Sequence, residues 1–306
     1  MTSLMPESED ALAILSGHYF QLFEDHLARL LDAKSDGVPE RLRESMAYSL
    51  LAGGKRLRPI LCLAAAERCG VGPEKALPMA VAIELIHTAS LIHDDLPCMD
   101  NDDLRRGKPT NHRAFGEALA LIAGDAMLIW AFGYALTHLP RGGISYEKVS
   151  KAVAILAEAS GPSGMCGGQV LDTDSASRTD EDDFVYSVAN AKTGALIRAS
   201  VVSGALLGDI SDTALRCYYD YGTHLGLAFQ IVDDILDVTR TKAELGKTPH
   251  KDEAQGKMTF ASVYGLDGAK SLAALNSEEA CKAIEELFPE GDLLIDLAKS
   301  LADRKS

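Results

Sequence analysis

Apolar residues recur at intervals of three and four along nearly the whole chain, the spacing that places them on one face of an α-helix. The strict alternation of apolar and polar residues that is typical of a half-buried strand is absent. Gly and Pro cluster at residues 53–54, 70–73, 106–109, 140–143, 161–168 and 246–249, where we predict breaks. The predicted helices are residues 9–31, 39–51, 57–69, 74–96, 115–137, 146–160, 180–207, 212–239, 259–275, 278–287 and 291–303. We therefore expect an all-α fold, a bundle of ten or more helices.

The composition agrees with one helical domain. The 306 residues contain no linker rich in Pro, Gly or Ser, so we predict a single domain over residues 1–306. Hydrophobic residues are 47% of the chain and aromatic residues 6%, which suits closely packed helices better than sheets. The formal net charge of −15 argues against nucleic acid or an anionic membrane as a partner. It does not exclude a small anion, because a few cations control the charge of one cleft.

Features of an exported or membrane protein are missing from the sequence. The six cysteines are scattered and form no CxxC pair, which indicates reduced thiols rather than disulfides or a zinc site. The first ten residues are acidic and are not arranged as a signal peptide. Charged residues interrupt the longest apolar runs before they reach the roughly 20 residues of a membrane span. We expect a cytoplasmic protein with no membrane span.

Two distant aspartate clusters carry the candidate chemistry, and each follows an apolar stretch. Their members are Asp94, Asp95 and Asp100 in the first cluster and Asp233, Asp234 and Asp237 in the second. Carboxylates this close together repel one another, and Mg²⁺ is the cation that combines one or two carboxylates with waters and substrate phosphates. We expect Pro97 to end the first helix, so that Asp100 comes from a loop, and the spacing of four to place Asp233 and Asp237 on one helical face. The alternative, solvated acids at two helix ends, opposes the helix dipole.

Four basic groups supply the positive charge that an anionic substrate requires. They are Lys55, Arg56 and Arg58 after the glycine turn 53–54; Arg105 and Arg106 after the first cluster; Lys192; and Lys247 with Lys257 after the second cluster. A glycine turn that leads into a helix, flanked by Lys and Arg, is suited to a diphosphate. A solvated loop or a local surface patch is the alternative for each group except Lys192, which interrupts an apolar helix and is costly there without a partner.

Two histidines near the first cluster allow more than one interpretation. His87 precedes Asp94 by two helical turns and faces the same way, but a core histidine bonded to a backbone carbonyl fits the pattern too. His93 adjoins Asp94, which is compatible with a metal-dependent phosphohydrolase. That hypothesis leaves the second acidic cluster and the Lys and Arg groups unexplained.

Taken together, these motifs resemble those of the trans-prenyl diphosphate synthases, the short-chain all-trans group that makes farnesyl and geranylgeranyl diphosphate. The resemblance covers residues 42–265, and its motifs occur in family order: 53–59, 91–100, 103–107, 124–125, 167–169, 192–194, 229–230, 233–237, 246–247 and Lys257. The four residues between Asp95 and Asp100 are similar to the bacterial and plastid type. The resemblance implies an isoprenoid-synthase fold with a central cavity, and a homodimer.

The resemblance also implies a role for each matching residue. The expected Mg²⁺ ligands, for three ions per active site, are Asp94, Asp100 and Asp233, with Asp95, Asp234 and Asp237 alongside. The residues expected to hold the allylic diphosphate are Arg105, Lys192, Lys247 and Lys257. Those expected to bind isopentenyl diphosphate are Lys55, Arg58, His87 and Arg106. Two further residues, Thr193 and Gln230, are expected beside the allylic carbons.

The implied reaction ionises an allylic diphosphate, condenses the cation with isopentenyl diphosphate and eliminates a proton. Mg²⁺, Lys and Arg stabilise the departing diphosphate, and no side-chain base is evident, so the released diphosphate is a candidate proton acceptor. One helical turn rises about 5.4 Å, roughly one isoprene unit, so the residues four and five before Asp94 form the first floor of the tail pocket. These are Ser90 and Ala89, both small. We therefore predict geranylgeranyl diphosphate, with farnesyl diphosphate as the alternative, and growth stopped deeper by Leu85, Ile86, Met127 or Trp130.

Two other classes share part of this pattern. A class I terpene cyclase uses the same acids and Mg²⁺ but needs no second diphosphate site, so the basic residues 53–59 argue against it. A non-catalytic partner subunit of the same fold is expected to lack acids from one cluster, and both clusters are intact here.

Overall fold

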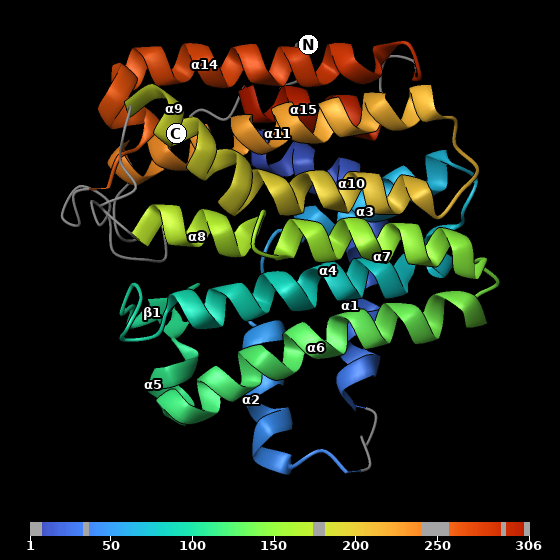
Figure 1. Cartoon of the computed structure of the whole chain (residues 1–306), viewed down its shortest axis with the longest axis vertical. Helices are drawn as coiled ribbons and strands as arrows, with labels where there is room; N and C mark the ends of the chain where they lie inside the picture. The colour runs from blue at the N-terminus through green and yellow to red at the C-terminus, as the bar shows by residue number, and fades with distance from the viewer. Residues whose placement is uncertain (1–7, 33–36, 174–180, 240–256, 289–291, 303–306) are drawn as a thin grey trace, which may run out of the picture.

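The computed structural model describes residues 8–32, 37–173, 181–239, 257–288 and 292–302, which form an all-α fold (Figure 1). The first helices are α1 (Ser8–Asp32), α2 (Glu40–Leu50), α3 (Leu57–Arg68) and α4 (Pro73–Asp94). A short hairpin of β1 (Leu104–Arg105) and β2 (Lys108–Pro109) follows α4. The remaining elements are α5 (Asn111–Phe115), α6 (Glu117–Arg141), α7 (Tyr146–Ser160), α8 (Met165–Thr173), α9 (Glu181–Val188), the π-helix η2 (Ala189–Gly194), α10 (Ala195–Leu206), α11 (Asp212–Thr239), α14 (Phe260–Glu285) and α15 (Leu293–Ala302).

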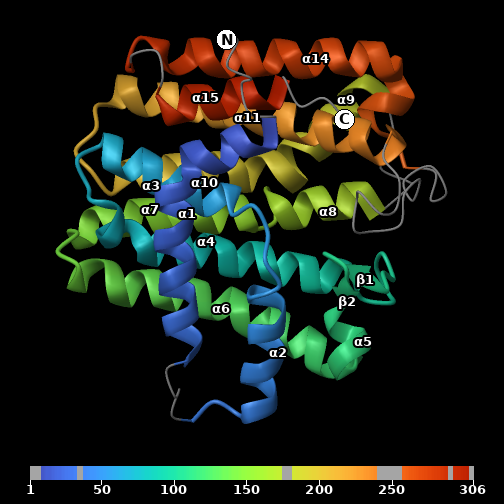
Figure 2. The ribbon, with the colours of Figure 1, turned by 180° about the vertical axis from the view of Figure 1, so that it is seen from behind.

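Helix α4 runs through the core of the bundle. It packs against α6, α3 and α10, while α11 lies between α10 and α14 (Figure 1). Helices α1 and α2 cross the other side (Figure 2). Most residues of α4 are buried, from Pro73 to Ile92, as expected for a helix that is apolar on all sides. The C-terminal end of α4, the β1–β2 hairpin and α8 lie at the same edge of the molecule, on the left in Figure 1.

The predicted all-α architecture and its ten or more helices are confirmed, but several boundaries were wrong. Helix α8 begins inside the predicted break 161–168, because the chain turns only at residues 161–164. Helix α6 continues through Pro140 to Arg141, since a proline in the last turn removes a single backbone hydrogen bond. The predicted helix 180–207 is divided by a π-helical turn. The two helices predicted between residues 259 and 287 are one element kinked at Gly265, where φ is 68°.

The β1–β2 hairpin was also missed, because two-residue strands have no alternating pattern to detect. Leu104 pairs with Pro109 and Arg105 with Lys108, in antiparallel register. The turn between them contains Arg106 at φ 53° and Gly107 at φ 75°. Both residues are in the left-handed region, the conformation that a tight hairpin turn requires. The hairpin thereby directs Arg105 to Asp95 at the end of α4 and Arg106 to the glycine turn 53–54.

Two described helices, α4 and α6, are long and apolar enough by length and composition to span a membrane, which the sequence analysis did not expect. Core helices of globular proteins meet the same criteria, and 72% of the apolar window of α4 is buried inside this fold. For α6 the buried share is 39%. Its large exposed apolar side chains include Leu121, Ile122, Ile129 and Leu136, which leaves an apolar face on α6 without a partner in the single chain.

Candidate active site

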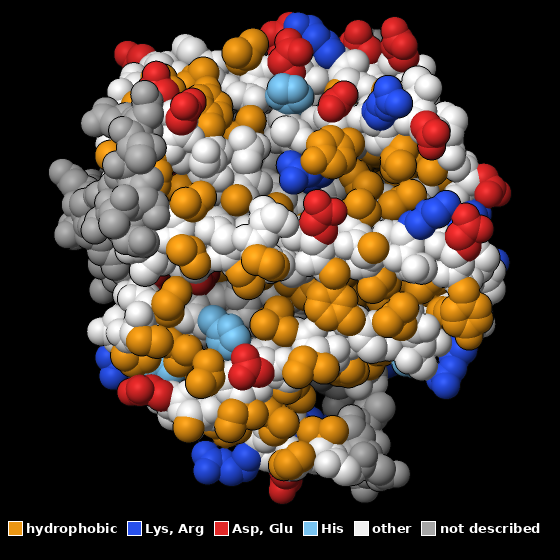
Figure 3. Space-filling view, viewed as in Figure 1, with side chains coloured by type: hydrophobic (Ala, Val, Ile, Leu, Met, Phe, Trp, Pro, Cys, Tyr) orange, Lys and Arg blue, Asp and Glu red, His pale blue; other side chains and the backbone are white. Residues whose placement is uncertain are grey.

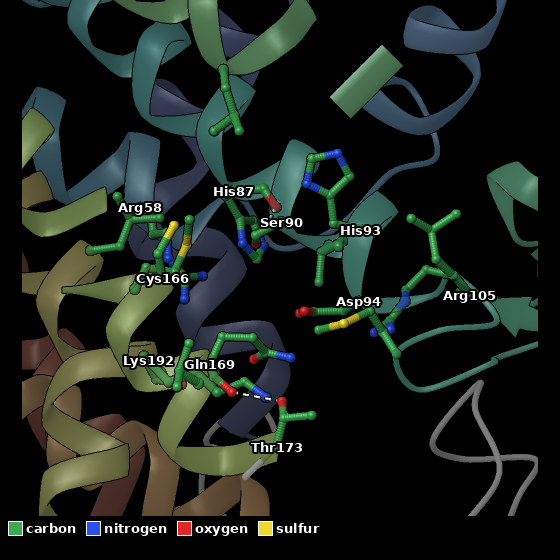
Figure 4. A pocket seen from close by; sticks show the side chains of 18 of the residues that line it. Arg58, His87, Ser90, His93, Asp94, Arg105, Cys166, Gln169, Thr173 and Lys192 are labelled. Carbon is green, nitrogen blue, oxygen red and sulfur yellow. Dashed lines mark hydrogen bonds between the residues drawn. The ribbon is translucent and has the colours of Figure 1, made fainter. Parts of the chain in front are cut away.

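A cavity of about 920 Å³ lies between α4, α6, α8, α10 and α11. Such a volume is typical of a small-molecule site. Figure 4 shows polar and charged side chains around it, among them His87, Asp94, Arg105 and Lys192. The apolar part of the lining comes from Leu91, Leu96, Met99, Leu121, Leu128, Met165, Val170, Leu196 and Phe229. The cavity is therefore charged at one end and hydrophobic over the rest of its wall.

The first aspartate cluster folds back on itself where α4 ends. As predicted, Asp100 follows the helix in a turn, and its backbone nitrogen donates to the carbonyl oxygen of Asp94 at 2.8 Å. Asp94 lines the cavity. Burial, with the nearby Asp100 and Asp95, raises the pKa of Asp94 above its usual value, although Lys192 and Arg105 oppose the rise. Carboxylates crowded in this way fit a cation.

Asp95 has a different environment from its neighbour. It is 3% exposed, and the Nε of Arg105 lies 3.1 and 3.3 Å from its two carboxylate oxygens. Arg105 belongs to β1, so this ion pair fixes the hairpin against the end of α4. Arg105 also lines the cavity. Asp95 thus holds a cation at the cavity wall.

The second cluster divides its members in the same manner. Asp233 is exposed and lines the cavity, whereas Asp234 and Asp237 are buried on α11. Asp234 accepts from Gln230 Nε2 at 2.7 Å through one oxygen and from the backbone nitrogen of Phe260 at 2.8 Å through the other. The first acid of each cluster therefore faces the cavity, and the second has protein partners.

Thr193 and Gln230 are linked to this arrangement. The Thr193 hydroxyl donates to Gln230 Oε1 at 2.6 Å, and the Gln230 amide nitrogen donates to Asp234. Because Asp234 accepts only, the chain of bonds fixes which end of the amide faces Thr193. Thr193 lines the cavity. Gln230 is not among the described residues that line the cavity, so it holds the Thr193 hydroxyl in place from behind the wall.

Lys192 reaches the cavity from the π-helix η2, whose extra residue shifts the helical face by one position. Its Nζ lies 2.7 Å from Asp172 Oδ2, and Lys257 Nζ lies 3.1 Å from the same oxygen and 3.4 Å from Asp100. The sequence analysis missed Asp172, because it predicted a break at residues 161–168 and no helix between that break and residue 180. One pattern in the sequence could have identified Asp172: it follows Gln169, a residue that lines the cavity, by about one helical turn.

Gly168 explains how α8 and η2 come so close. A Cβ at this position would collide with the backbone nitrogen and Cα of Lys192. Only glycine allows the two backbones to touch there. The contact sets the separation of Asp172 from Lys192.

The basic loop, residues 53–58, lies at the other end of the polar wall beside a second cavity of about 400 Å³. Arg58 lines both cavities, and its Nε is buried with no hydrogen-bond partner among the described residues. Arg106 Nη1 donates to the carbonyl oxygen of Gly53, and its guanidinium covers Gly54, where a Cβ would collide with it. Burial and the charges of Arg58 and Arg106 lower the pKa of His87 well below its usual value. His87 is therefore neutral near pH 7.

The remaining predicted site residues differ in whether they line a cavity. Lys55 is exposed and lines the second cavity, and Ser90 lines the main one, where its hydroxyl donates to the His87 carbonyl at 2.8 Å. Ala89 is fully buried and is not among the residues of the described chain that line the cavity. Lys247 lies outside the described residues. His93 is directed at α6, with Nε2 3.2 Å from the Leu121 carbonyl oxygen.

The carboxylates do not form a ready-made metal cage. Among the described residues, no three His, Cys, Asp or Glu side chains stand close enough to hold a metal ion by themselves. Mg²⁺ is commonly bound through one or two carboxylates, with waters and substrate phosphates completing its shell. Asp94 and Asp233, which face one cavity, fit that mode of binding.

An all-α fold with acids, basic groups and apolar side chains around one cavity is suited to a ligand that carries both a diphosphate and a hydrocarbon tail. The chain belongs to the polyprenyl synthetase family, whose model matches residues 39–287. It is 46% identical over 277 residues to geranylgeranyl pyrophosphate synthase of Catharanthus roseus (90% of this chain, 77% of that one). It is 42% identical over 267 residues to farnesyl diphosphate synthase of Bacillus subtilis (87% and 90%).

A solved structure agrees over nearly the whole chain. The geranyltransferase of Helicobacter pylori, complexed with magnesium and isoprenyl diphosphate, matches with a TM-score of 0.82 and 31% identity, covering 99% of this chain and 98% of that one. The resemblance to prenyl diphosphate synthases and the predicted isoprenoid-synthase fold are thereby confirmed. The chain is a prenyltransferase of isoprenoid biosynthesis.

Proposed function

We propose that this prenyltransferase condenses isopentenyl diphosphate with an allylic diphosphate, head to tail, until the product has twenty carbons. The observation that carries the proposal is that one cavity joins the two aspartate clusters, the basic groups and a long hydrophobic wall. A diphosphate at the charged end would have its hydrocarbon tail along Leu128, Met165 and Leu196. A single domain over residues 1–306 is part of the proposal.

The allylic diphosphate is assigned to the end of the cavity where both clusters meet. Asp94, Asp100 and Asp233 are the proposed ligands of three Mg²⁺ ions, which when bound supply positive charge to the departing diphosphate. Arg105 and Lys192 line the same end, and Lys257 is linked to Asp100. Lys247 is included by resemblance alone. These side chains orient the diphosphate and take up its developing charge.

Isopentenyl diphosphate is assigned to the basic loop, with Lys55, Arg58, His87 and Arg106 as its ligands. The buried Nε of Arg58 has no hydrogen-bond partner among the described residues, which supports this assignment because such a donor costs free energy until an acceptor binds. The second cavity adjoins the main one through Arg58, His87 and Phe229. The two substrates would therefore meet near His87.

The wall between the two diphosphate sites suits a carbocation. Thr193 presents an oxygen dipole whose orientation is fixed by its hydrogen bond to Gln230, and neither side chain is a strong nucleophile. The carboxylates among the described residues that line the cavity are Asp94 and Asp233, both members of the aspartate clusters. We infer that the released diphosphate accepts the proton lost after condensation, so Lys192 and Arg105 would hold both leaving group and base.

The proposed length of twenty carbons depends on the small side chain of Ser90 in the cavity wall. The relatives include both geranylgeranyl and farnesyl diphosphate synthases, so fifteen carbons is the alternative product. Leu128, rather than the fully buried Met127, lines the cavity on α6. Leu85, Ile86, Met127 and Trp130 remain predicted stops beyond the present wall.

A homodimer is the proposed state of the enzyme. Hydrophobic side chains gather over α6 and α7 on the face seen in Figure 3, and Ile129 is 75% exposed. An apolar face of this kind is typical of a subunit interface. An Ile129→Glu variant should shift the mass measured by light scattering toward the monomer. We also propose that the protein is cytoplasmic, because all six of its cysteines are free thiols.

Product analysis tests the function directly. The protein is incubated with Mg²⁺, isopentenyl diphosphate and dimethylallyl, geranyl or farnesyl diphosphate in turn, and the dephosphorylated alcohols are separated by length. A twenty-carbon alcohol supports the synthase and the open cavity. A product that stops at fifteen carbons supports the synthase activity but refutes the proposed length of twenty carbons. Cyclic hydrocarbons, or no condensation by folded protein, would favour the cyclase or the non-catalytic subunit, and chelation of Mg²⁺ should stop turnover without unfolding.

A further inference from the structure

Arg56 is the middle basic residue of the basic loop, and its side chain is directed into the protein. The side chain is 0% exposed. Its Nε donates to Glu24 Oε1 and its Nη1 to Glu84 Oε1, both at 2.6 Å, and its Nη2 donates to the Leu50 carbonyl oxygen at 2.8 Å. These partners belong to α1, α4 and the end of α2. One guanidinium thus fastens the loop to three helices.

The backbone of Arg56 indicates that these contacts dictate the loop conformation. Arg56 has φ 50° and ψ 32°, in the left-handed region that side chains other than glycine rarely adopt. Such a conformation persists only where the surrounding contacts over-determine it. The turn leads directly into α3, with Lys55 before it and Arg58 after it. The orientation of both cations therefore depends on where Arg56 is held.

Glu84 adds an electrostatic reason for the contact. It is 2% exposed and lines the second cavity together with His87, which follows one turn later on the same face of α4. An uncompensated carboxylate there would repel a diphosphate. Arg56 also lines this cavity, and its buried guanidinium neutralises Glu84 at 2.6 Å.

We propose that Arg56 is a positioning residue for isopentenyl diphosphate, which orients Lys55 and Arg58 and neutralises Glu84 without touching the substrate. The inference rests on the proposed function, in which the basic loop binds isopentenyl diphosphate. It differs from the sequence interpretation, which grouped Arg56 with the cations around the substrate. The hydrogen-bond partners of Arg56 are Glu24, Glu84 and Leu50, none of which is assigned to the allylic site, so loss of this network should affect one substrate selectively.

The test measures KM for isopentenyl diphosphate, KM for geranyl diphosphate and kcat in two variants. Arg56→Lys keeps the charge but loses the planar fork that reaches three partners. We expect its KM for isopentenyl diphosphate to rise about tenfold or more, as a small misplacement of binding groups does, while KM for geranyl diphosphate stays within about twofold. Glu24→Ala removes only the partner that is 30% exposed, so this variant should fold and show a smaller rise in the same KM.

Arg68→Lys is the matched control, because Arg68 ends α3, the helix that Arg56 precedes, and pairs with a buried acid. Its Nε lies 2.6 Å from Asp292 Oδ2, and the Asp292 side chain is 1% exposed. The control should lower the melting temperature and leave both KM values unchanged. A selective rise in Arg56→Lys and none in Arg68→Lys supports positioning. Equal rises for both substrates, or a loss of stability alone, would overturn the proposal.

An Arg58→Ala variant separates failure of this inference from failure of the function. If Arg58→Ala raises KM for isopentenyl diphosphate and both Arg56→Lys and Glu24→Ala do not, the basic loop binds the substrate and the positioning role of Arg56 is refuted. If none of the three variants changes that KM, the assignment of the loop is itself wrong and the inference is overturned with it. Wild-type turnover, measured in parallel, tests the proposed reaction independently of both.

Discussion

A Ser90→Phe substitution tests the proposed control of product length. Ser90 lies four residues before Asp94 and lines the main cavity, about 6 Å along the helix axis from the aspartate. A phenyl ring there would fill cavity space that the hydrocarbon tail needs and shorten the tail that fits by one isoprene unit. Expelling five carbons at about 0.8 kcal/mol each removes about 4 kcal/mol of burial, roughly a thousandfold in the rate of the last addition. We therefore expect a fifteen-carbon product in place of a twenty-carbon one.

The assay is chromatography of dephosphorylated products after incubation with labelled isopentenyl diphosphate and geranyl diphosphate. The cavity of about 920 Å³ has room for the ring, so the substitution should not unfold the protein. Ser90→Ala is the control: it removes the hydroxyl that donates to the His87 carbonyl at 2.8 Å but fills no space. Its product should keep twenty carbons. A twenty-carbon product from Ser90→Phe would refute the position of the floor.

Three further perturbations have defined outcomes. Asp234→Asn places an amide donor against Gln230 or Phe260 and should lower the stability to urea by about 1–3 kcal/mol and reduce kcat. Gly168→Ala should cost about 1–3 kcal/mol because backbone atoms must move, whereas Gly133→Ala, with nothing near its Cβ, should not destabilise α6. Burial raises the pKa of Asp172, but Lys192 and Lys257 outweigh it and hold the pKa below 3.8. Its stabilising contribution is present above that pH and is lost as the pH falls through the folded-state pKa, so urea unfolding of Asp172→Asn should differ from wild type at neutral pH and converge with it in acid.

The helices and the motif residues were predictable because both leave local patterns. Periodicity identified α4 and α11, and the turn after Asp94 followed from Pro97. The π-helical turn at Lys192 was not predictable, since a one-residue insertion leaves the apolar pattern nearly unchanged. Helix α8 was missed because its glycines were interpreted as helix breakers. One of them, Gly168, instead allows the backbone of α8 to contact the backbone of η2. Long-range packing, which the sequence pattern does not record, decides both cases.

The sequence pattern also does not show which way the charged side chains face. Adjacent aspartates look equivalent in the sequence, yet Asp94 faces the cavity while Asp95 holds Arg105, and Asp233 lines the wall while Asp234 orients Gln230. Helical geometry explains the division, because neighbouring residues on a helix point about 100° apart and cannot both face one ligand. A pair of acids therefore supplies one group toward the cavity and one that fixes its wall. The paired motif would serve a site whose electrostatics depend as much on immobilised cations and dipoles as on the metal ions themselves.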